Sequence, residues 1–148
     1  MTTESDPAVT RVTIILDTPN DWLSWLFIRK DSCRRHELWQ YVDPDTLREQ
    51  LPKLTAPLEP QYMDYKANAT RLADLSPDDH SSFRWDYERY ERLQTIYDKR
   101  VQALADFNLE ISKTIAKRRL YLIQDCETAY DRLVTLKKHL APVLPWRA

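Results

Sequence analysis

The clearest periodic pattern in the chain lies between residues 79 and 116, where apolar side chains recur every three or four positions. Charged residues such as Arg84, Glu88 and Arg92 fall between them at i,i+4 spacing. This pattern predicts one long helix, or two helices joined near residues 106–109. We expect most of the apolar stripe to fill a core; its members are Phe83, Tyr87, Tyr90, Leu93, Tyr97, Val101, Leu104, Phe107, Ile111 and Ile115.

A second helical pattern covers residues 22–35 and follows a Thr-Pro-Asn-Asp turn that supplies capping residues. Its apolar side chains occupy two faces, because Trp22 and Leu26 lie along one and Leu23 and Phe27 along another. A helix needs only one apolar stripe to pack against a core. We therefore expect this helix either to lie centrally in the core or to carry a second contact surface.

The remaining helical segments are shorter. The stretch DPDTLREQL predicts a short helix with Pro44 in its first turn. Residues 117–125 predict a short apolar helix or turn, and the chain closes with a helix that Asp125 caps and Pro142 ends.

Proline and polar residues mark the connections. Residues 51–78 hold four prolines and predict an irregular connection. Residues 1–10 predict a disordered N-terminus, residues 11–17 a short extended arm, and residues 143–148 a C-terminal tail. The pattern as a whole predicts an all-α fold, a small helical bundle formed by one domain over residues 11–142.

The composition narrows the possible functions, because the chain has no glycine. Phosphate-binding loops, dinucleotide fingerprints and tight hairpin turns need glycine. Its absence argues against a nucleotide-binding enzyme and against a hairpin-rich β protein. The net charge of -1 gives no general attraction to nucleic acid or to membranes.

Candidate catalytic groups are scattered. His36, His80 and His139 lack metal-ligand spacing, and the helix dipole accounts for the acidic pair Asp78 and Asp79 beside His80. We therefore predict no enzyme activity, no metal and no cofactor.

The cysteines and the hydropathy bear on the compartment. Cys33 and Cys126 lie far apart and are expected to be free thiols, with a disulfide as the alternative. No apolar run is long enough to span a bilayer and the polar N-terminus does not have the pattern of a signal peptide, so we expect a cytoplasmic protein without a membrane partner.

A local basic group is the candidate for contacts with nucleic acid. A solvated helix surface is the favoured interpretation, and weak, non-specific binding of RNA is the alternative. The cations in question are Lys113, Lys117, Arg118, Arg119, Lys137 and Lys138, with Arg132 beside them.

Two blocks of sequence carry a family resemblance. LDTPNDWLSWLFIRKDSCRRHELWQYVDP resembles the N-terminal part of Gag-like proteins of copia-type LTR retrotransposons, particularly fungal ones, and DCETAYDRLVTLKKHLAP is similar to a later helix of that family. Many family members have glycine before the first aromatic residue, whereas this chain has Thr18-Pro19-Asn20. The positions that match, or that pack with them, are Trp22, Trp25, Leu26, Leu38, Trp39, Val42, Pro44, Ala129, Tyr130, Leu133, Leu136, Lys137, Leu140, Ala141 and Pro142.

The resemblance implies a structural protein: the N-terminal lobe of a capsid, which self-associates in its full-length context into a particle that packages RNA. The lobe is either excised from a longer Gag product or retained by a shortened gene. It also implies that the tryptophans serve as core or interface residues. The sequence has no zinc knuckle and no Asp-Ser/Thr-Gly protease motif. Two alternatives stay open: an RNA-binding or adaptor module acting through the basic group, and a dimerisation scaffold using the apolar stripe of residues 83–115.

Overall fold

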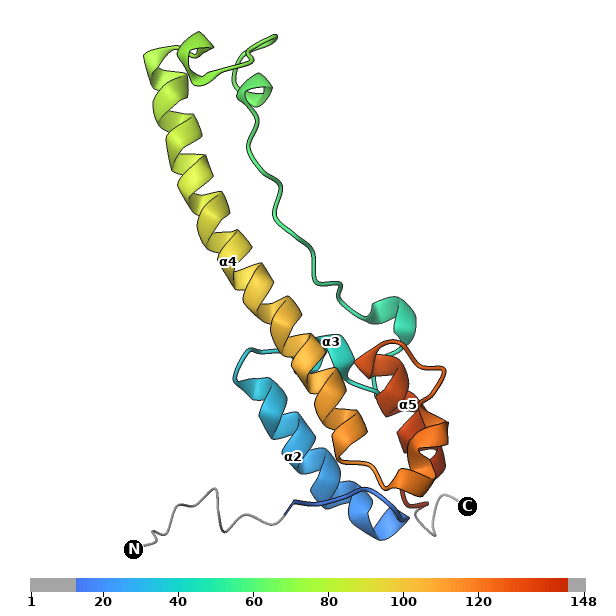
Figure 1. Ribbon diagram of the computed structural model, residues 1–148. Coiled ribbons are helices and arrows are strands. Elements are labelled where there is room, and N and C mark those ends of the chain that lie inside the picture. The colour runs from blue at the N-terminus through green and yellow to red at the C-terminus, as the bar shows by residue number, and fades with distance from the viewer. Residues whose placement is uncertain (1–12, 144–148) are drawn as a thin grey trace, which may run out of the picture. The chain divides into compact units, whose positions relative to one another are not determined.

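The computed structural model describes residues 13–143, which form helices joined by turns and extended connections (Figure 1). No β-strand occurs in this part of the chain, which confirms the predicted all-α fold. The N-terminal segment 1–10 and nearly all of the tail 143–148 lie outside the described residues. The α-helices are α2 (Trp22–Arg34), α3 (Trp39–Val42), α4 (Pro77–Lys113) and α5 (Ala129–Leu140); the 3-10 helices are η1 (Pro19–Asp21), η2 (Arg48–Gln50), η3 (Tyr62–Asp64), η4 (Leu72–Asp74) and η5 (Lys117–Leu122).

Contacts group the described residues into two compact units, each with its own apolar cluster. Unit 1 comprises the chain up to Pro52 and again from Ala103, and unit 2 comprises Lys53–Gln102. The helix α4 begins in unit 2 and ends in unit 1, so the long helix predicted around residues 79–116 is one continuous element. The single domain predicted over residues 11–142 stays a prediction.

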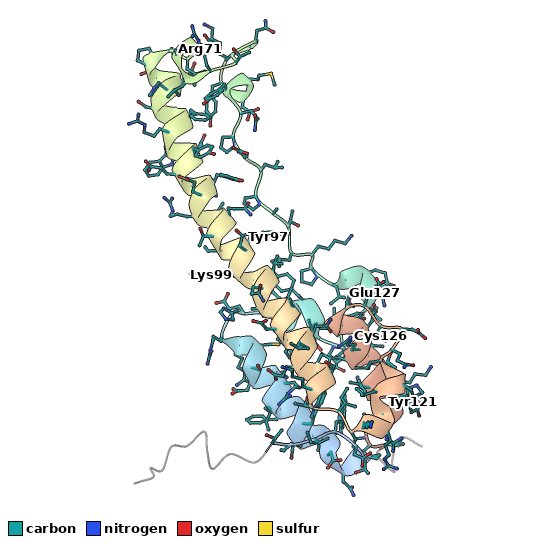
Figure 2. The ribbon with its side chains drawn as sticks, in the orientation of Figure 1. Arg71, Tyr97, Lys99, Tyr121, Cys126 and Glu127 are labelled. Atoms are coloured by element: carbon teal, nitrogen blue, oxygen red, sulfur yellow. The ribbon has the colours of Figure 1, made fainter. Side chains whose placement is uncertain are left out.

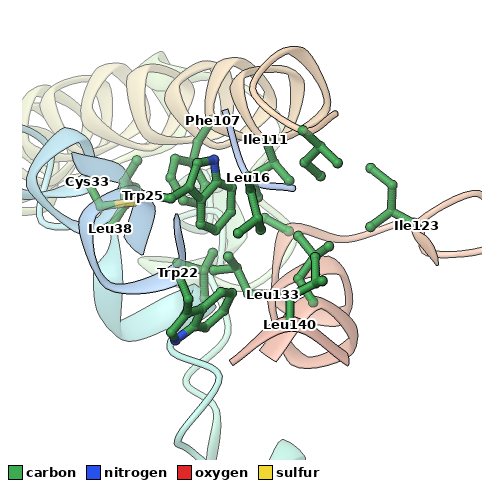
Figure 3. Packing of buried hydrophobic residues seen from close by; sticks show 14 residues of the cluster. Leu16, Trp22, Trp25, Cys33, Leu38, Phe107, Ile111, Ile123, Leu133 and Leu140 are labelled. Atoms are coloured by element: carbon green, nitrogen blue, oxygen red, sulfur yellow. The ribbon is translucent and has the colours of Figure 1, made fainter. Parts of the chain in front are cut away.

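Unit 1 has an apolar core built from α2, α3, α5, the end of α4 and the extended arm. Leu16 of the arm is fully buried and forms an isolated parallel bridge with Ile115, which gives the predicted arm its place. Figure 3 shows Leu16 among Trp25, Ile111 and Leu133. Burying side chains of this size contributes roughly 1.5–3 kcal/mol each. The buried members are Leu16, Trp22, Trp25, Cys33, Leu38, Val42, Phe107, Ile111, Ile115, Ile123, Ala129, Leu133, Leu136 and Leu140.

The end of α2 shows how a chain without glycine closes a helix. The N–H of Leu38 donates to the carbonyl of Cys33 at 2.9 Å, and that of Glu37 to Arg34 at 3.2 Å. These are the two bonds of a Schellman motif, whose left-handed position glycine usually occupies. Here Glu37 takes that position with φ 54°. The turn directs Leu38 back into the core beside Cys33, where both are buried.

The C-terminal helix α5 starts later than predicted. Thr128 caps it, since its hydroxyl accepts a hydrogen bond from the N–H of Asp131 at 3.1 Å. The predicted cap, Asp125, does not cap the helix. Thr128, which follows it, has the extended backbone that a cap requires. The helix ends at Leu140, before Pro142.

The short helix predicted from DPDTLREQL is wrong in type and place. Pro44 lies in a turn, and only residues 48–50 are helical, as η2. The amide N–H of Asp45 donates to the carboxylate of Asp43 at 2.9 Å, a local bond that favours a turn over a helix.

Unit 2 pairs the first part of α4 with the proline-rich segment. Residues 51–61 form no helix, which fits the irregular connection that their prolines predict. Ser76 caps α4, because its hydroxyl accepts a hydrogen bond from the N–H of Asp79 at 3.2 Å. A small aromatic cluster surrounds Phe83, whose ring centroid lies 4.8 Å from that of Tyr62 and 5.6 Å from that of Tyr65.

The predicted core stripe along α4 is buried only at its two ends. Phe83 lies in unit 2, and Phe107, Ile111 and Ile115 lie in unit 1. Between them the stripe is not core, because Leu93 is 41% and Val101 43% exposed. No described element covers the middle of the helix fully enough to bury these side chains.

Candidate functional site

Most of the residues singled out by the family resemblance come together in the core of unit 1, whereas Lys137 and Pro142 of the same set are exposed. Nine of them are buried: Trp22, Trp25, Leu38, Val42, Ala129, Tyr130, Leu133, Leu136 and Leu140. Leu26 and Trp39 are partly buried against the same cluster, and Pro44 lies half-buried in its turn. The core role implied for these positions fits their burial.

A buried polar network between α2 and the end of α4 escaped the sequence analysis. The indole N–H of Trp25 donates to the hydroxyl of Thr114 at 3.0 Å and to its carbonyl at 3.1 Å. Arg29 donates to the same hydroxyl at 2.7 Å. Its Nε also lies 3.0 Å from a carboxylate oxygen of Glu110, outside hydrogen-bond alignment, so this contact is an ion pair.

The network fixes α2 against α4 by polar contacts as well as apolar ones. Arg29 is only 5% exposed, and burial lowers the pKa of its guanidinium while the Glu110 carboxylate opposes that shift. Ser32 donates to Glu110 at 3.0 Å and so holds the carboxylate in place. A signal was present in the sequence, because Arg29 shares the buried face of α2 with Trp22, Trp25 and Cys33.

A polar cavity of about 460 Å³ borders this network within unit 1. Its charged side chains carry both signs, and the ring of His36 is exposed. No group of histidine, cysteine or acidic residues suited to a metal ion occurs in residues 13–143. The cavity is lined by Ile28, Arg29, Asp31, Ser32, Arg35, His36, Leu38, Ala103, Asp106, Phe107 and Glu110.

The two cysteines are both free thiols. Cys33 is fully buried, and burial raises the pKa of its thiol to about 12. A thiol in that state is a poor nucleophile, because only the thiolate reacts. Cys126 is half-buried and lies 3.5 Å from the hydroxyl of Thr135.

Several cations of the predicted basic group are paired with acids. Arg118 donates to the Asp17 carboxylate at 2.6 Å, and Arg119 donates to the Asp17 carbonyl at 2.8 Å. Lys137 is paired with Asp45. Arg118 lowers the pKa of Asp17 through its hydrogen bond, against the effect of burial.

Exposed and unpaired cations of that group are fewer than the sequence suggests. Lys113, Lys117 and Lys138 are exposed and take part in no ion pair among the described residues. Arg132 is used internally, donating to the carbonyl of Asn108 at 2.9 Å. Tertiary pairing therefore leaves about half of the predicted patch for phosphate contacts.

The outer face of α2 is apolar and exposed. Leu23 is 71% and Phe27 63% exposed, one helical turn apart, while Trp22 and Trp25 of the same helix are buried. The two apolar faces predicted for this helix therefore differ in role: one fills the core and the other is open to solvent.

Comparisons with protein-family models, with curated proteins and with solved structures found no match. Among the helices that the structure describes, none combines the length and the apolar character required to cross a bilayer.

Proposed function

We propose that this chain is a structural protein of Gag type, a helical capsid-like domain that self-associates in the cytoplasm into an RNA-packaging particle. The observation that carries the proposal is the division of α2 into a buried face and an exposed face bearing Leu23 and Phe27. The resemblance of residues 16–44 and 125–142 to copia-type Gag proteins supports it independently.

Leu23 and Phe27 suit a weak contact with another copy. Covering an apolar side chain of this size contributes roughly 1.5–3 kcal/mol. Two such residues provide much less than the ~1,200–2,000 Å² that a stable pair of proteins buries. Association through this face is therefore concentration-dependent, and symmetry multiplies it when many copies join.

The test is light scattering behind a sizing column, from micromolar to near-millimolar protein. The wild type grows into larger species as concentration rises. Replacement of both Leu23 and Phe27 by glutamine, a good helix former, abolishes that growth while the circular dichroism spectrum stays unchanged.

A matched control carries Leu58→Gln and Met63→Gln. These residues are 93% and 65% exposed and lie in unit 2, so the control removes comparable exposed apolar surface elsewhere. Growth that survives the α2 substitutions, or that both pairs abolish equally, contradicts the role of the α2 face. A dimer at every concentration favours instead the scaffold alternative, in which the exposed middle of the α4 stripe pairs.

A further inference from the structure

The first half of α4 carries a second exposed face, separate from its apolar stripe. Trp85, Arg89, Arg92, Ile96 and Lys99 follow one another by steps of four, three, four and three residues, so they share one side of the helix. All five are exposed, Trp85 by 68% and Ile96 by 47%. Figure 2 shows Lys99 on the opposite side of α4 from Tyr97, a member of the apolar stripe.

The three cations of this face are not neutralised by neighbours. The side chains of Arg89, Arg92 and Lys99 take part in no ion pair or hydrogen bond among the described residues. At about 100° per residue, Glu91 and Asp98 lie more than ~100° around the helix from the middle of the face.

The other two acidic residues of this segment, Asp86 and Glu88, form no ion pair with the three cations. Asp86 accepts a hydrogen bond from the hydroxyl of Tyr65. Glu88 lies at the edge of the face, one helical turn before Arg92, and forms no ion pair with it. Three unpaired positive charges thus flank an exposed indole and a short apolar side chain.

We infer that this face binds single-stranded RNA, with Trp85 stacking on a base and Arg89, Arg92 and Lys99 contacting phosphates. The inference rests on the proposed function, since it assigns the RNA contact of that particle to unit 2 rather than to the basic group of residues 113–138. Exposed aromatics interleaved with cations are the arrangement that single-strand binding uses, because every base has a face on which to stack.

The dimensions of the face suit a short strand. Trp85 and Lys99 lie about 21 Å apart along the helix axis, at ~1.5 Å per residue. That length corresponds to roughly six nucleotides at a stacked rise of ~3.4 Å. Beside Trp85, a hollow of about 220 Å³ lined also by His80, Ser81, Arg84 and Glu88 offers polar groups to the edge of a base.

Charge and apolar area distinguish RNA from a membrane as the partner. A helix that lies on a bilayer buries a broad apolar face rich in Trp, Phe and Leu. This face has only Trp85 and Ile96, with cations between them. It matches a row of phosphates better than it matches an acyl layer.

The experiment measures binding of a fluorescent oligouridylate of about 12 nucleotides, within the ~4–16 that single-strand-binding folds cover. Binding is followed by anisotropy over a range of salt concentrations. Three phosphate contacts predict a slope of log K against log salt of about −2, from ~0.7 per contact. Glutamine at Arg89, Arg92 and Lys99 together brings that slope near zero.

A control triple replaces Lys113, Lys117 and Lys138 by glutamine. It removes the same number of positive charges from exposed positions of the other candidate surface, so it separates the effect of their location from the effect of net charge. We expect this control to bind RNA as the wild type does. Trp85→Ala lowers affinity about fivefold or more, as loss of one stacked base predicts, whereas Tyr121→Ala, at a residue 61% exposed, leaves it unchanged.

Four outcomes overturn the inference: no RNA binding by the wild type, equal losses in the two triples, loss in the control triple alone, or binding to anionic vesicles in place of RNA. Light scattering of the same variants separates this inference from the proposed function. The α4 triple keeps its concentration-dependent association if assembly and RNA binding use different faces. If light scattering shows no assembly of the wild type, the proposed function is contradicted, whatever the result of the RNA-binding experiment.

Discussion

The ion pair between Arg29 and Glu110 gives a quantitative test of how unit 1 is held together. Arg29 is nearly buried, with 6% of its side chain exposed, whereas Glu110 is 33% exposed. Removing one partner of a fully buried pair costs about 3–5 kcal/mol, because the other charge is left without compensation. Because Glu110 is partly exposed to water, its carboxylate stays hydrated when Arg29 is removed, and that removal costs less than the loss of a partner in a fully buried pair.

The asymmetry predicts unequal effects for the two partners. Glu110→Gln keeps the shape but strands a buried guanidinium, and we expect it to lower the free energy of unfolding by about 2 kcal/mol. Arg29→Met removes the buried charge and leaves Glu110 to water, so we expect a loss of about 1 kcal/mol or less. In the double variant no guanidinium is left at position 29 for residue 110 to neutralise, so the total loss of stability stays near that of Arg29→Met alone.

The assay is urea unfolding followed by tryptophan fluorescence, since unit 1 contains Trp22, Trp25 and Trp39. A double-mutant cycle then gives a coupling of about 1–2 kcal/mol between the two positions. The difference should persist in high salt, because salt screens buried pairs weakly. The reasoning is refuted if Arg29→Met costs as much as Glu110→Gln, or if the two losses simply add.

Two further predictions follow from the titratable groups. Arg118 holds the pKa of Asp17 below its ordinary value of 3.8, so the stability from this pair is present above that value and is lost as pH falls through the lower folded value. Thermal unfolding should therefore separate the wild type from Asp17→Asn at neutral pH and bring the two together in acid; a constant gap at all pH values would exclude the pair as the cause. Because burial raises the pKa of Cys33 to about 12, a thiol reagent should label Cys126 of the native protein far faster than Cys33. Peptide mapping after brief labelling checks this, and equal labelling would mean that the core of unit 1 opens readily.

The sequence by itself determined the elements that have strong local signals. The long apolar period of residues 79–116 predicted α4, and a helix beginning at Trp22 was visible from its turn and its aromatic spacing. The absence of glycine argued against a hairpin-rich protein, and the prolines concentrated in residues 51–78 predicted an irregular connection. Apolar periodicity and the positions of prolines and helix-capping residues are local properties of a sequence. They can therefore be recognised without knowledge of the tertiary structure.

Two of the wrong predictions concern local structure, namely the cap of α5 and the helix expected after Pro44. Asp125 and Thr128 are both good capping residues, and only the backbone conformation decided that Thr128 caps α5. In the same way the bond within residues 43–45 favoured a turn over the predicted helix.

The tertiary structure decided which charges and which apolar residues are available. Asp17 lies far along the chain from Arg118 and Arg119, and its approach to them removed both from the predicted basic patch. Arg29 carries a charge that a sequence pattern assigns to solvent, yet the approach of Glu110 and Thr114 buries it. The apolar period of α4 looks uniform in sequence, but only its ends are buried in apolar clusters, so Leu93 and Val101 in its middle stay exposed. Burial and pairing depend on partners distant in the chain, and periodicity carries no information about where those partners lie.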